Sequence, residues 1–251
     1  MKPPISTVII TLNEARNVVA CIQAASLVSE EIIVLDSGSA DDTVVLAENA
    51  GARVIQQDWL GYSQTKNIGN QQTSHDWILS LDADEVLSPE LIDAIQHCAY
   101  EPDTVYLLNR LNNYCGHWVR YCNWYPDYVY RLFPKKDCEW EGQFVHEKLS
   151  YPTHFKVKKL SGHLLHYTYR TPEEHLAKIE RYARLSAEDK ISRGKNLNLL
   201  KRWFSPLFRF INVYLIHLGF LDGKTGFQIA RREAYYVKRR NEWILTMKRQ
   251  K

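Results

Sequence analysis

Residues 82–85, with the sequence DADE, directly follow an apolar run and could bind a metal ion. Side chains alternate in direction along an extended chain, so Asp82 and Asp84 point to the same side of the backbone. Two such carboxylates, together with substrate phosphates, are typical ligands of Mg²⁺ or Mn²⁺. The ion neutralises charge that develops on a phosphate leaving group. Alternatively, these acids have no metal-binding role and only stabilise the N-terminus of a helix that begins near Ser88.

Alternating strands and helices over the first hundred residues would position this cluster. Strands are predicted from the β-branched and apolar runs at 5–12, 31–36, 52–57 and 76–82. Helices are predicted between them at 14–28, 37–51 and 62–73. The fold class is therefore α/β, a mostly parallel sheet with helices on both faces.

Polar residues follow three of the predicted strands. They occupy residues 11–14 after the first strand, 36–39 after the second and 82–85 after the fourth. In open α/β sheets, ligands bind outside the carboxyl ends of the strands. We therefore expect the three segments to converge on one crevice.

Beyond residue 103 the pattern changes. Short aromatic-rich segments at 104–111, 127–133 and 154–169 predict an irregular antiparallel extension that covers the crevice and supplies the second substrate's site. Thr171 as N-cap and Pro172 at the first helical position predict a long helix that ends near residue 193.

Composition and charge restrict the class of protein. The chain has 251 residues, 45% of them apolar, which is enough for a sizeable core. Its five cysteines are odd in number and lack a Cys-x-x-Cys pair, and the N-terminus lacks a secretory apolar run, so we expect reduced thiols and a cytoplasmic protein. Residues 201–251 contain 12 Lys and Arg against 3 acids. This basic tail suits nucleic acid or phospholipid headgroups, unless it is only a solvated helix face.

Four segments, TLNEARNV, VLDSGSADDT, QTKNIG and LSLDADE, carry a family resemblance. In order and spacing they resemble the nucleotide-sugar domain of inverting glycosyltransferases of family 2, which have the GT-A fold. The resemblance covers roughly residues 5–90 and implies a UDP-sugar donor with Mg²⁺ or Mn²⁺ as cofactor.

The resemblance implies donor contacts at the first two strand ends. Thr11, Asn13 and Glu14 would line the nucleoside pocket. Asp36 would accept a hydrogen bond from the uracil ring or its ribose, and Gly38 would let the backbone turn tightly. The alternative for Asp36 is a simple turn and helix-capping role.

It also implies contacts around the diphosphate. Lys66 would lie near the pyrophosphate or base, although the family often has Arg there, which binds phosphate bidentately where Lys is a point charge. Asp82 and Ala83 would contact the ribose or the ion, and Asp84 would hold the ion. His166 would be a third metal or diphosphate contact, or alternatively a satisfied core histidine.

Inverting transfer needs a general base for the acceptor hydroxyl. The segment CEWEGQFVHEKL offers Glu147, with His146 or Glu141 as neighbours. A Val-His-Glu element after an Arg-Leu-Phe strand resembles a narrower branch, the bacterial lipopolysaccharide core β-1,4-glucosyltransferases. The branch resemblance implies Glu147 as the base; the alternative is a surface strand with alternating charges.

The apolar part of the basic tail is too short to span a bilayer. Its uninterrupted stretch, residues 210–221, is about twelve residues against the roughly twenty that a span requires. Amphipathic helices in the headgroup plane of an anionic membrane fit better. Alternatively, these helices pack against the rest of the protein, residues 1–200, or form a dimer contact.

Together these features predict a peripheral enzyme on the inner face of the cell membrane. It would move a hexose, with inversion, from a UDP-sugar such as UDP-glucose to a lipopolysaccharide core or other lipid-linked saccharide. We expect nucleotide-sugar binding by residues 1–103, acceptor binding and the base in 104–170, and membrane-associating helices in 171–251. The oligomeric state stays open.

Two other classes are considered. A nucleotidyltransferase also combines such a sheet with an acidic metal site, but would carry a Gly-rich basic loop where this chain has TLNEARN. A nucleic-acid-binding protein would use the basic tail, yet the acidic body and the lack of a recognised motif argue against nucleic acid as a partner.

Overall fold

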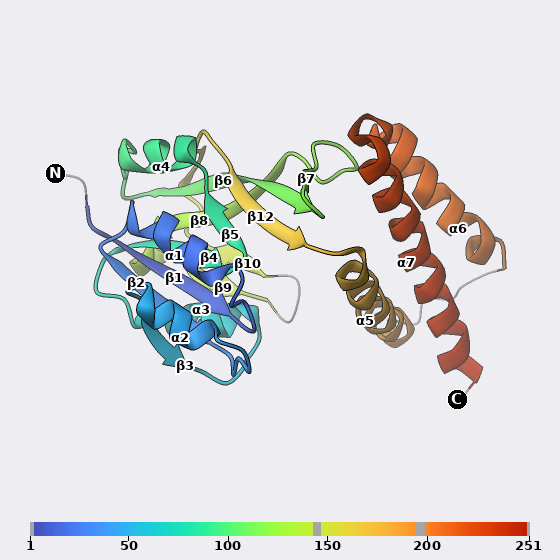
Figure 1. Ribbon diagram of the computed structural model, residues 1–251, viewed down its shortest axis with the longest axis horizontal. Coiled ribbons are helices and arrows are strands. Elements are labelled where there is room, and N and C mark those ends of the chain that lie inside the picture. Colours follow the sequence, from blue (N-terminus) through green and yellow to red (C-terminus); the bar gives the residue numbers. More distant parts are fainter. Residues whose placement is uncertain (1–2, 143–146, 194–198, 250–251) are drawn as a thin grey trace. The chain divides into compact units, whose positions relative to one another are not determined.

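The computed structural model describes residues 3–142, 147–193 and 199–249 (Figure 1). The chain forms two compact units. The first comprises Met1–Arg110 and Asp127–His166, and the second comprises Leu111–Pro126 and Tyr167–Lys251. These structural units do not test the expected division of function into donor binding by residues 1–103, acceptor binding by 104–170 and membrane association by 171–251, which stays a prediction.

A mixed β-sheet forms the centre of the first unit, although its residues 111–114, 117–118 and 167–169 belong to the second unit. Its strands are β1 (Ile5–Thr11), β2 (Glu31–Asp36), β3 (Arg53–Gln56), β4 (Trp77–Asp82), β5 (Glu85–Leu87), β6 (Thr104–Tyr114), β7 (His117–Trp118), β8 (Asp127–Pro134), β11 (Lys156–Lys159) and β12 (Leu164–Tyr169). Within the described residues the order is β3-β2-β1-β4-β8-β6-β12-β5, with β11 and β7 paired to β6. A separate hairpin contains β9 (Glu139–Glu141) and β10 (Lys148–Ser150).

The sheet has the predicted parallel part and antiparallel extension. β3, β2, β1 and β4 are parallel neighbours, and β8 pairs antiparallel with both β4 and β6. All seven residues of β1 are buried, as expected of a parallel strand covered on both faces. The expected strand at 154–169 is instead two strands, β11 and β12; β11 pairs parallel with β6, and Gly162 at φ +87° lies between the two.

Helices cover both faces of this sheet. They are α1 (Val18–Ser26), α2 (Thr43–Asn49), α3 (Tyr62–Gln71) and α4 (Pro89–Gln96), with a 3₁₀ turn at Lys135–Asp137. Because side chains alternate along β1, Ile9 packs in the core layer that contains Ile22 of α1. Val8 packs in the opposite layer, against which Ile68 of α3 lies. The predicted helix at 14–28 begins only at Val18, because the preceding residues form the loop after β1.

α3 lies unusually close to the sheet. A Cβ atom on Gly69 would lie only 2.4 Å from Val8 Cγ1 and 2.7 Å from Leu35 Cδ2, so only glycine permits this approach. The helix also buries polar side chains, including Thr65 and Lys66, which are fully inaccessible. Buried polar groups require partners, so α3 must lie beside groups that bind them.

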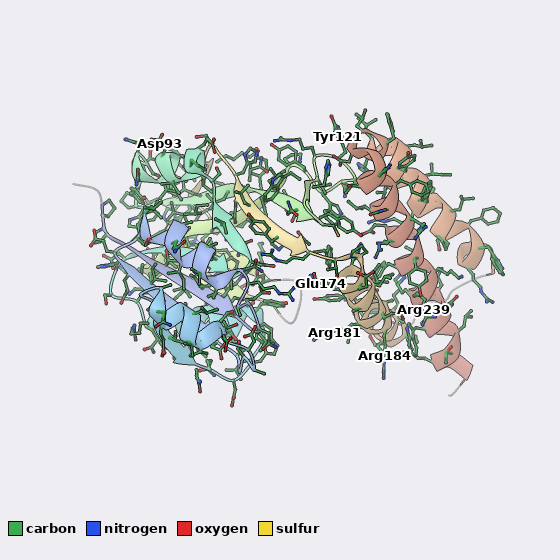
Figure 2. The ribbon with its side chains drawn as sticks, in the orientation of Figure 1. Asp93, Tyr121, Glu174, Arg181, Arg184 and Arg239 are labelled. Atoms are coloured by element: carbon green, nitrogen blue, oxygen red, sulfur yellow. The ribbon has the colours of Figure 1, made fainter. Side chains whose placement is uncertain are left out.

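The second unit is mainly helical. It contains α5 (Pro172–Ser192), α6 (Leu199–Ile211), the π-helical segment η2 (Asn212–Ile216), the 3₁₀ turn η3 (Gly219–Asp222) and α7 (Gly223–Arg249). The predicted start of the long helix is confirmed. Thr171 Oγ1 accepts from the Glu174 backbone N–H at 3.2 Å, and the Glu174 carboxylate accepts from Thr171 N–H at 3.3 Å (Glu174 is labelled in Figure 2).

α7 packs against both α5 and α6. Between α5 and α7, Arg239 Nε donates to Glu180 Oε1 at 2.8 Å (Arg239 is labelled in Figure 2). In the described part of the chain no single helix has the length and apolarity to cross a membrane, whereas the bent pair Arg202–Ile216 and Gly219–Met247, at 73°, passes that test jointly.

Candidate active site

The three polar strand ends lie along one edge of the sheet, as predicted. β1 lies between β2 and β4, with Thr11 opposite Asp36 and Ile10 opposite Asp82. The carboxyl ends of these parallel strands therefore bring the expected donor-binding segments together. Thr11 is buried, and its Oγ1 has no hydrogen-bond partner among the described residues.

The loops after β1 and β2 are bound to each other. Asn13, in the left-handed region at φ 57°, accepts from the Ala40 N–H at 2.8 Å. Its own N–H donates to Ser39 Oγ at 2.8 Å, and the Glu14 N–H donates to Thr43 Oγ1 at 2.8 Å. Asn13 and Glu14 are thus placed by hydrogen bonds between the two loops, which form one wall.

Asp36 fixes the turn after β2. The side chain is buried, and Oδ2 accepts from the Gly38 N–H at 3.0 Å and the Ser39 N–H at 2.9 Å. Gly38 has φ +91°, which favours glycine. The turn role considered for Asp36 is therefore present; its contact with a nucleoside stays a prediction.

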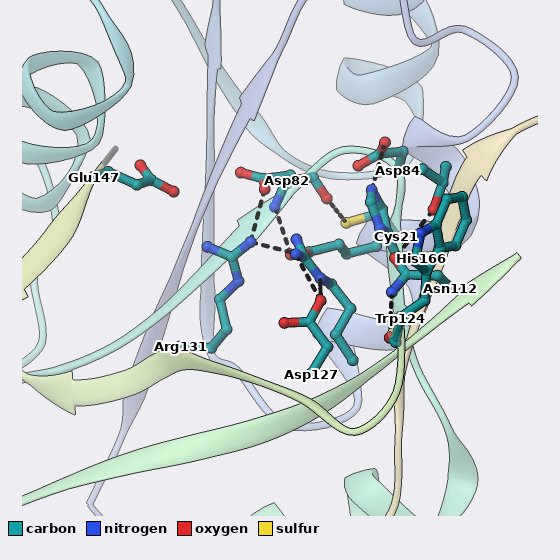
Figure 3. Close-up of polar contacts among 12 residues, drawn as sticks. Cys21, Asp82, Asp84, Asn112, Trp124, Asp127, Arg131, Glu147 and His166 are labelled. Atoms are coloured by element: carbon teal, nitrogen blue, oxygen red, sulfur yellow. Dashed lines mark hydrogen bonds and ion pairs between the residues drawn. The ribbon is translucent and has the colours of Figure 1, made fainter. Parts of the chain in front are cut away.

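Asp82 lies between two cations, Lys66 and Arg131, and its contact with Arg131 is drawn in Figure 3. Oδ2 accepts from Arg131 Nη2 at 2.7 Å, and Oδ1 lies 3.2 Å from Lys66 Nζ. Burial would raise the pKa of the Asp82 carboxyl, but Arg131 and Lys66 together outweigh burial and hold this pKa well below its usual range. Asp82 is therefore ionised at neutral pH, and both of its oxygens face positive charge.

Lys66 also binds the expected base. Its Nζ donates to Glu147 Oε1 at 2.7 Å and lies 4.8 Å from the Trp140 ring centroid. The other carboxylate oxygen, Glu147 Oε2, is buried and has no hydrogen-bond partner in the described part of the chain. The structure places the Lys66 ammonium between two carboxylates, and its expected position near the pyrophosphate or base stays a prediction. Of the neighbours named for Glu147, Glu141 is exposed on β9, and His146 lies outside the described residues.

Arg131 and Glu85 complete a buried charge network that the sequence analysis missed. Arg131 Nη2 donates to Glu85 Oε1 at 2.7 Å, and Glu85 Oε2 accepts from the Asp82 N–H at 3.0 Å. Arg110 lies 3.5 Å from Glu85 and 2.8 Å from Asp127. The third acid of DADE thus binds arginines. Arg131, directly before the apolar Leu132 and Phe133 of a predicted strand, was the available signal, because a buried cation needs an anionic partner.

Asp84 and His166 lie together beside this network (Figure 3). His166 Nε2 is 3.1 Å from Asp84 Oδ2, and Ala83 is buried with its N–H donating to Ile10 O. Among the described residues, no three His, Cys, Asp or Glu side chains are grouped to hold a metal. Mg²⁺ and Mn²⁺ do not require such a cage, since substrate phosphates and water supply the remaining ligands. Asp84 with His166 therefore fits an ion that arrives with a diphosphate.

Known proteins place this chain among enzymes that transfer sugars. Residues 6–146 match glycosyl transferase family 2. The chain belongs to this family, and it is a glycosyltransferase. It is 31% identical over 234 residues to a glycosyltransferase of Rickettsia bellii, covering 89% of this chain and 80% of that protein. It is 28% identical to the lipopolysaccharide core biosynthesis glycosyltransferase LpsC of Rhizobium meliloti, covering 94% and 90%.

Among solved structures, glucosyl-3-phosphoglycerate synthase from Mycobacterium tuberculosis, in complex with Mn²⁺, UDP and glucosyl-3-phosphoglycerate, is 28% identical with a TM-score of 0.34. The match covers 41% of this chain and 44% of that one, less than half of either. Family membership and the sheet topology agree with the predicted GT-A fold. The same membership sets aside the nucleotidyltransferase and nucleic-acid-binding alternatives.

Proposed function

We propose that the protein transfers a hexose from a UDP-sugar to a hydroxyl of a lipid-linked saccharide, with inversion at the anomeric carbon. One observation carries the proposal: the Lys66 ammonium contacts both Asp82 and Glu147. The donor-side acid and the expected base thus share one site, although 81 residues separate Lys66 from Glu147.

Glu147 is the proposed general base. Lys66 holds Oε1, so Oε2 is left to accept the acceptor's proton. As that proton leaves, the acceptor oxygen forms a bond to the anomeric carbon, and the bond from this carbon to the phosphate oxygen breaks on the opposite face. The sugar is transferred with inversion and UDP departs with the electron pair.

The proposed cofactor is Mg²⁺ or Mn²⁺, which Asp84 and His166 would hold. When bound, the ion neutralises negative charge on the departing diphosphate. The buried pairs of Asp82 with Lys66 and Arg131 fix the wall on which Asp84 is placed.

The proposed donor is UDP-glucose, and the proposed acceptor is a heptose of the lipopolysaccharide inner core. Similarity to LpsC over nearly the whole chain and the branch resemblance around Glu147 support this choice. The proposed location, peripheral on the inner face of the cell membrane, follows from where a lipid-linked acceptor is available.

A transfer assay tests the proposal. The full chain is incubated with a panel of nucleotide sugars and truncated lipopolysaccharide acceptors, with and without Mn²⁺ or Mg²⁺, and the anomeric configuration of the product is determined by NMR. We expect metal-dependent transfer from UDP-glucose with inversion. Glu147→Gln should lower kcat by about 10²- to 10⁴-fold while the protein still binds UDP-glucose.

Glu141→Gln is the matched control, since it makes the same chemical change at an exposed position of β9. It should retain nearly full activity. Loss of activity in Glu141→Gln with a normal Glu147→Gln enzyme would transfer the base role to Glu141, and a retained configuration in the product would exclude the inverting mechanism.

A further inference from the structure

α6 and η2 expose large apolar side chains along one face. The most exposed of these are Trp203, Phe204, Leu207, Phe208, Leu215 and Ile216. Trp203 is 69% exposed and Phe208 64%. In α6 these side chains form two pairs four residues apart, 203 with 207 and 204 with 208, which places them on one helical stripe, and the remaining two follow in η2. A contiguous exposed apolar surface of this kind marks an interaction site.

The opposite face of α6 packs against α7 through an aromatic contact of Phe210 and through polar contacts. Asn241 Nδ2 of α7 donates to Ser205 Oγ at 2.9 Å, and Arg209 Nη2 donates to Glu233 Oε2 at 2.7 Å. Asn241 is only 2% exposed. A surface helix in water normally turns its large apolar side chains inward, whereas α6 exposes most of them. The surface of α6 is therefore suited to an apolar environment.

A cationic cavity of about 500 Å³ lies at the start of α7. Lys224 and Arg231 line it together with Tyr214 and Phe227. Both cations are exposed, and neither forms an ion pair with any residue that the structure describes. The Phe227 ring packs 5.7 Å from the ring of Phe210 of α6, so the cavity adjoins the same helix.

We propose that this surface, the apolar stripe of α6 and η2 with the Lys224–Arg231 cavity, binds a bilayer of anionic phospholipid. The apolar side chains enter the boundary between headgroups and acyl chains, while the two cations bind lipid phosphates. Charge complementarity favours a lipid occupant over a second copy of this chain, because a two-fold contact would enclose two sets of unpaired cations. The proposal does not depend on the transfer reaction.

Vesicle flotation of the full chain tests this proposal. We expect the protein to float with vesicles containing phosphatidylglycerol and to bind phosphatidylcholine vesicles far more weakly. The double variant Lys224→Gln with Arg231→Gln should lower the partition coefficient on anionic vesicles by about 30-fold, since each basic residue near such a surface contributes about fivefold. Its matched control, Lys136→Gln with Lys156→Gln, removes the same charge from exposed positions of the first unit and should bind like wild type.

Insertion of the stripe is tested separately. Brominated acyl chains should quench part of the tryptophan emission, and Trp203→Phe should lose that part. Phe204→Ser with Phe208→Ser should bind weakly to all vesicles while its circular dichroism and Tm stay normal, because both side chains are exposed. Absence of anionic vesicle binding at low salt, or equal binding by the cavity variant and its control, would refute the proposal. Dimerisation abolished by the Phe204/Phe208 variant, without vesicle binding, would instead assign the surface to a second copy.

Discussion

The two units differ in where they place their large apolar side chains. In the first unit the apolar residues form the two core layers, and the buried charges are compensated at the carboxyl ends of the strands. The second unit has a small apolar core that includes Val213 and Ile229, but its helix α6 meets α7 partly through polar contacts and exposes most of its large apolar side chains. The difference shows that an apolar sequence alone does not identify a core. Whether an apolar side chain is buried depends on what packs against that face of its helix or strand.

The largest effect should come from Asp84, which has few structural contacts. Asp84→Asn should lower transfer by about a thousandfold, because a bound cation contributes several kcal/mol of charge stabilisation. Its free energy of unfolding should change little, whereas Asp82→Asn should also destabilise the fold by removing the carboxylate charge that Lys66 and Arg131 share. Kinetics and urea denaturation measure both quantities. Exposed Asp93 of α4, labelled in Figure 2, supplies the control Asp93→Asn, and an active Asp84→Asn enzyme would contradict the metal site.

The buried charges of the first unit should be costly to break. Arg131→Met should lower the free energy of unfolding by about 3–5 kcal/mol, since Asp82 and Glu85 lose their shared cation. Arg193→Met in the second unit breaks only an exposed pair with Asp189 and should cost less than about 0.5 kcal/mol. If urea denaturation showed equal losses of unfolding free energy for Arg131→Met and Arg193→Met, the expected difference between buried and exposed ion pairs would be wrong.

The same substitution in the two apolar environments compares the units directly. Leu79→Ala in β4 deletes a fully buried side chain and should cost about 2–5 kcal/mol. Leu207→Ala in α6, where the side chain is 56% exposed, should change the free energy of unfolding in water by no more than about 0.5 kcal/mol. A large loss for Leu207→Ala would show that the stripe is covered within the protein.

A smaller, pH-dependent effect should come from His175 in the second unit. Burial, aided by Arg232 and Lys178, lowers the pKa of this imidazole from 6.5 to about 4. Because the unfolded chain binds the proton first, His175 should cost no stability above about pH 6.5 and should progressively destabilise the fold as the pH falls towards 4, by about 3 kcal/mol in total. Denaturation at a series of pH values should show a shallower slope for His175→Gln; an unchanged slope would mean that the imidazole is protonated in the fold.

Much of the first unit could be predicted from the sequence. The β-branched runs and helical periodicity identified β1 to β4 and α1 to α3, because local pattern and burial agree there. Convergence of Asp36 and Asp82 followed from parallel strand direction. The contact of Lys66 with Glu147 could not be derived, since it depends on how the β9–β10 hairpin packs against α3.

The second unit was less predictable. Thr171 and Glu174 carried a complete capping signal, so the start of α5 was correct. The amphipathic character expected of the tail is visible in α6, yet a periodic pattern does not state which face is inside. Nor could the break at η2 and η3 be derived, because the apolar run from residue 210 to 221 contains no proline and only Gly219 as a local signal.

Gly69 has a consequence for chemistry at a distance. Since its hydrogen is all that separates α3 from Val8 and Leu35, a methyl group there would lift the helix off the sheet. Lys66 stands almost one turn earlier on the same helix, and its ammonium would then be drawn away from both carboxylates that it joins. The missing Cβ of Gly69 therefore determines where the Lys66 ammonium lies, three residues away. Gly69→Ala should lower activity although residue 69 contacts neither substrate.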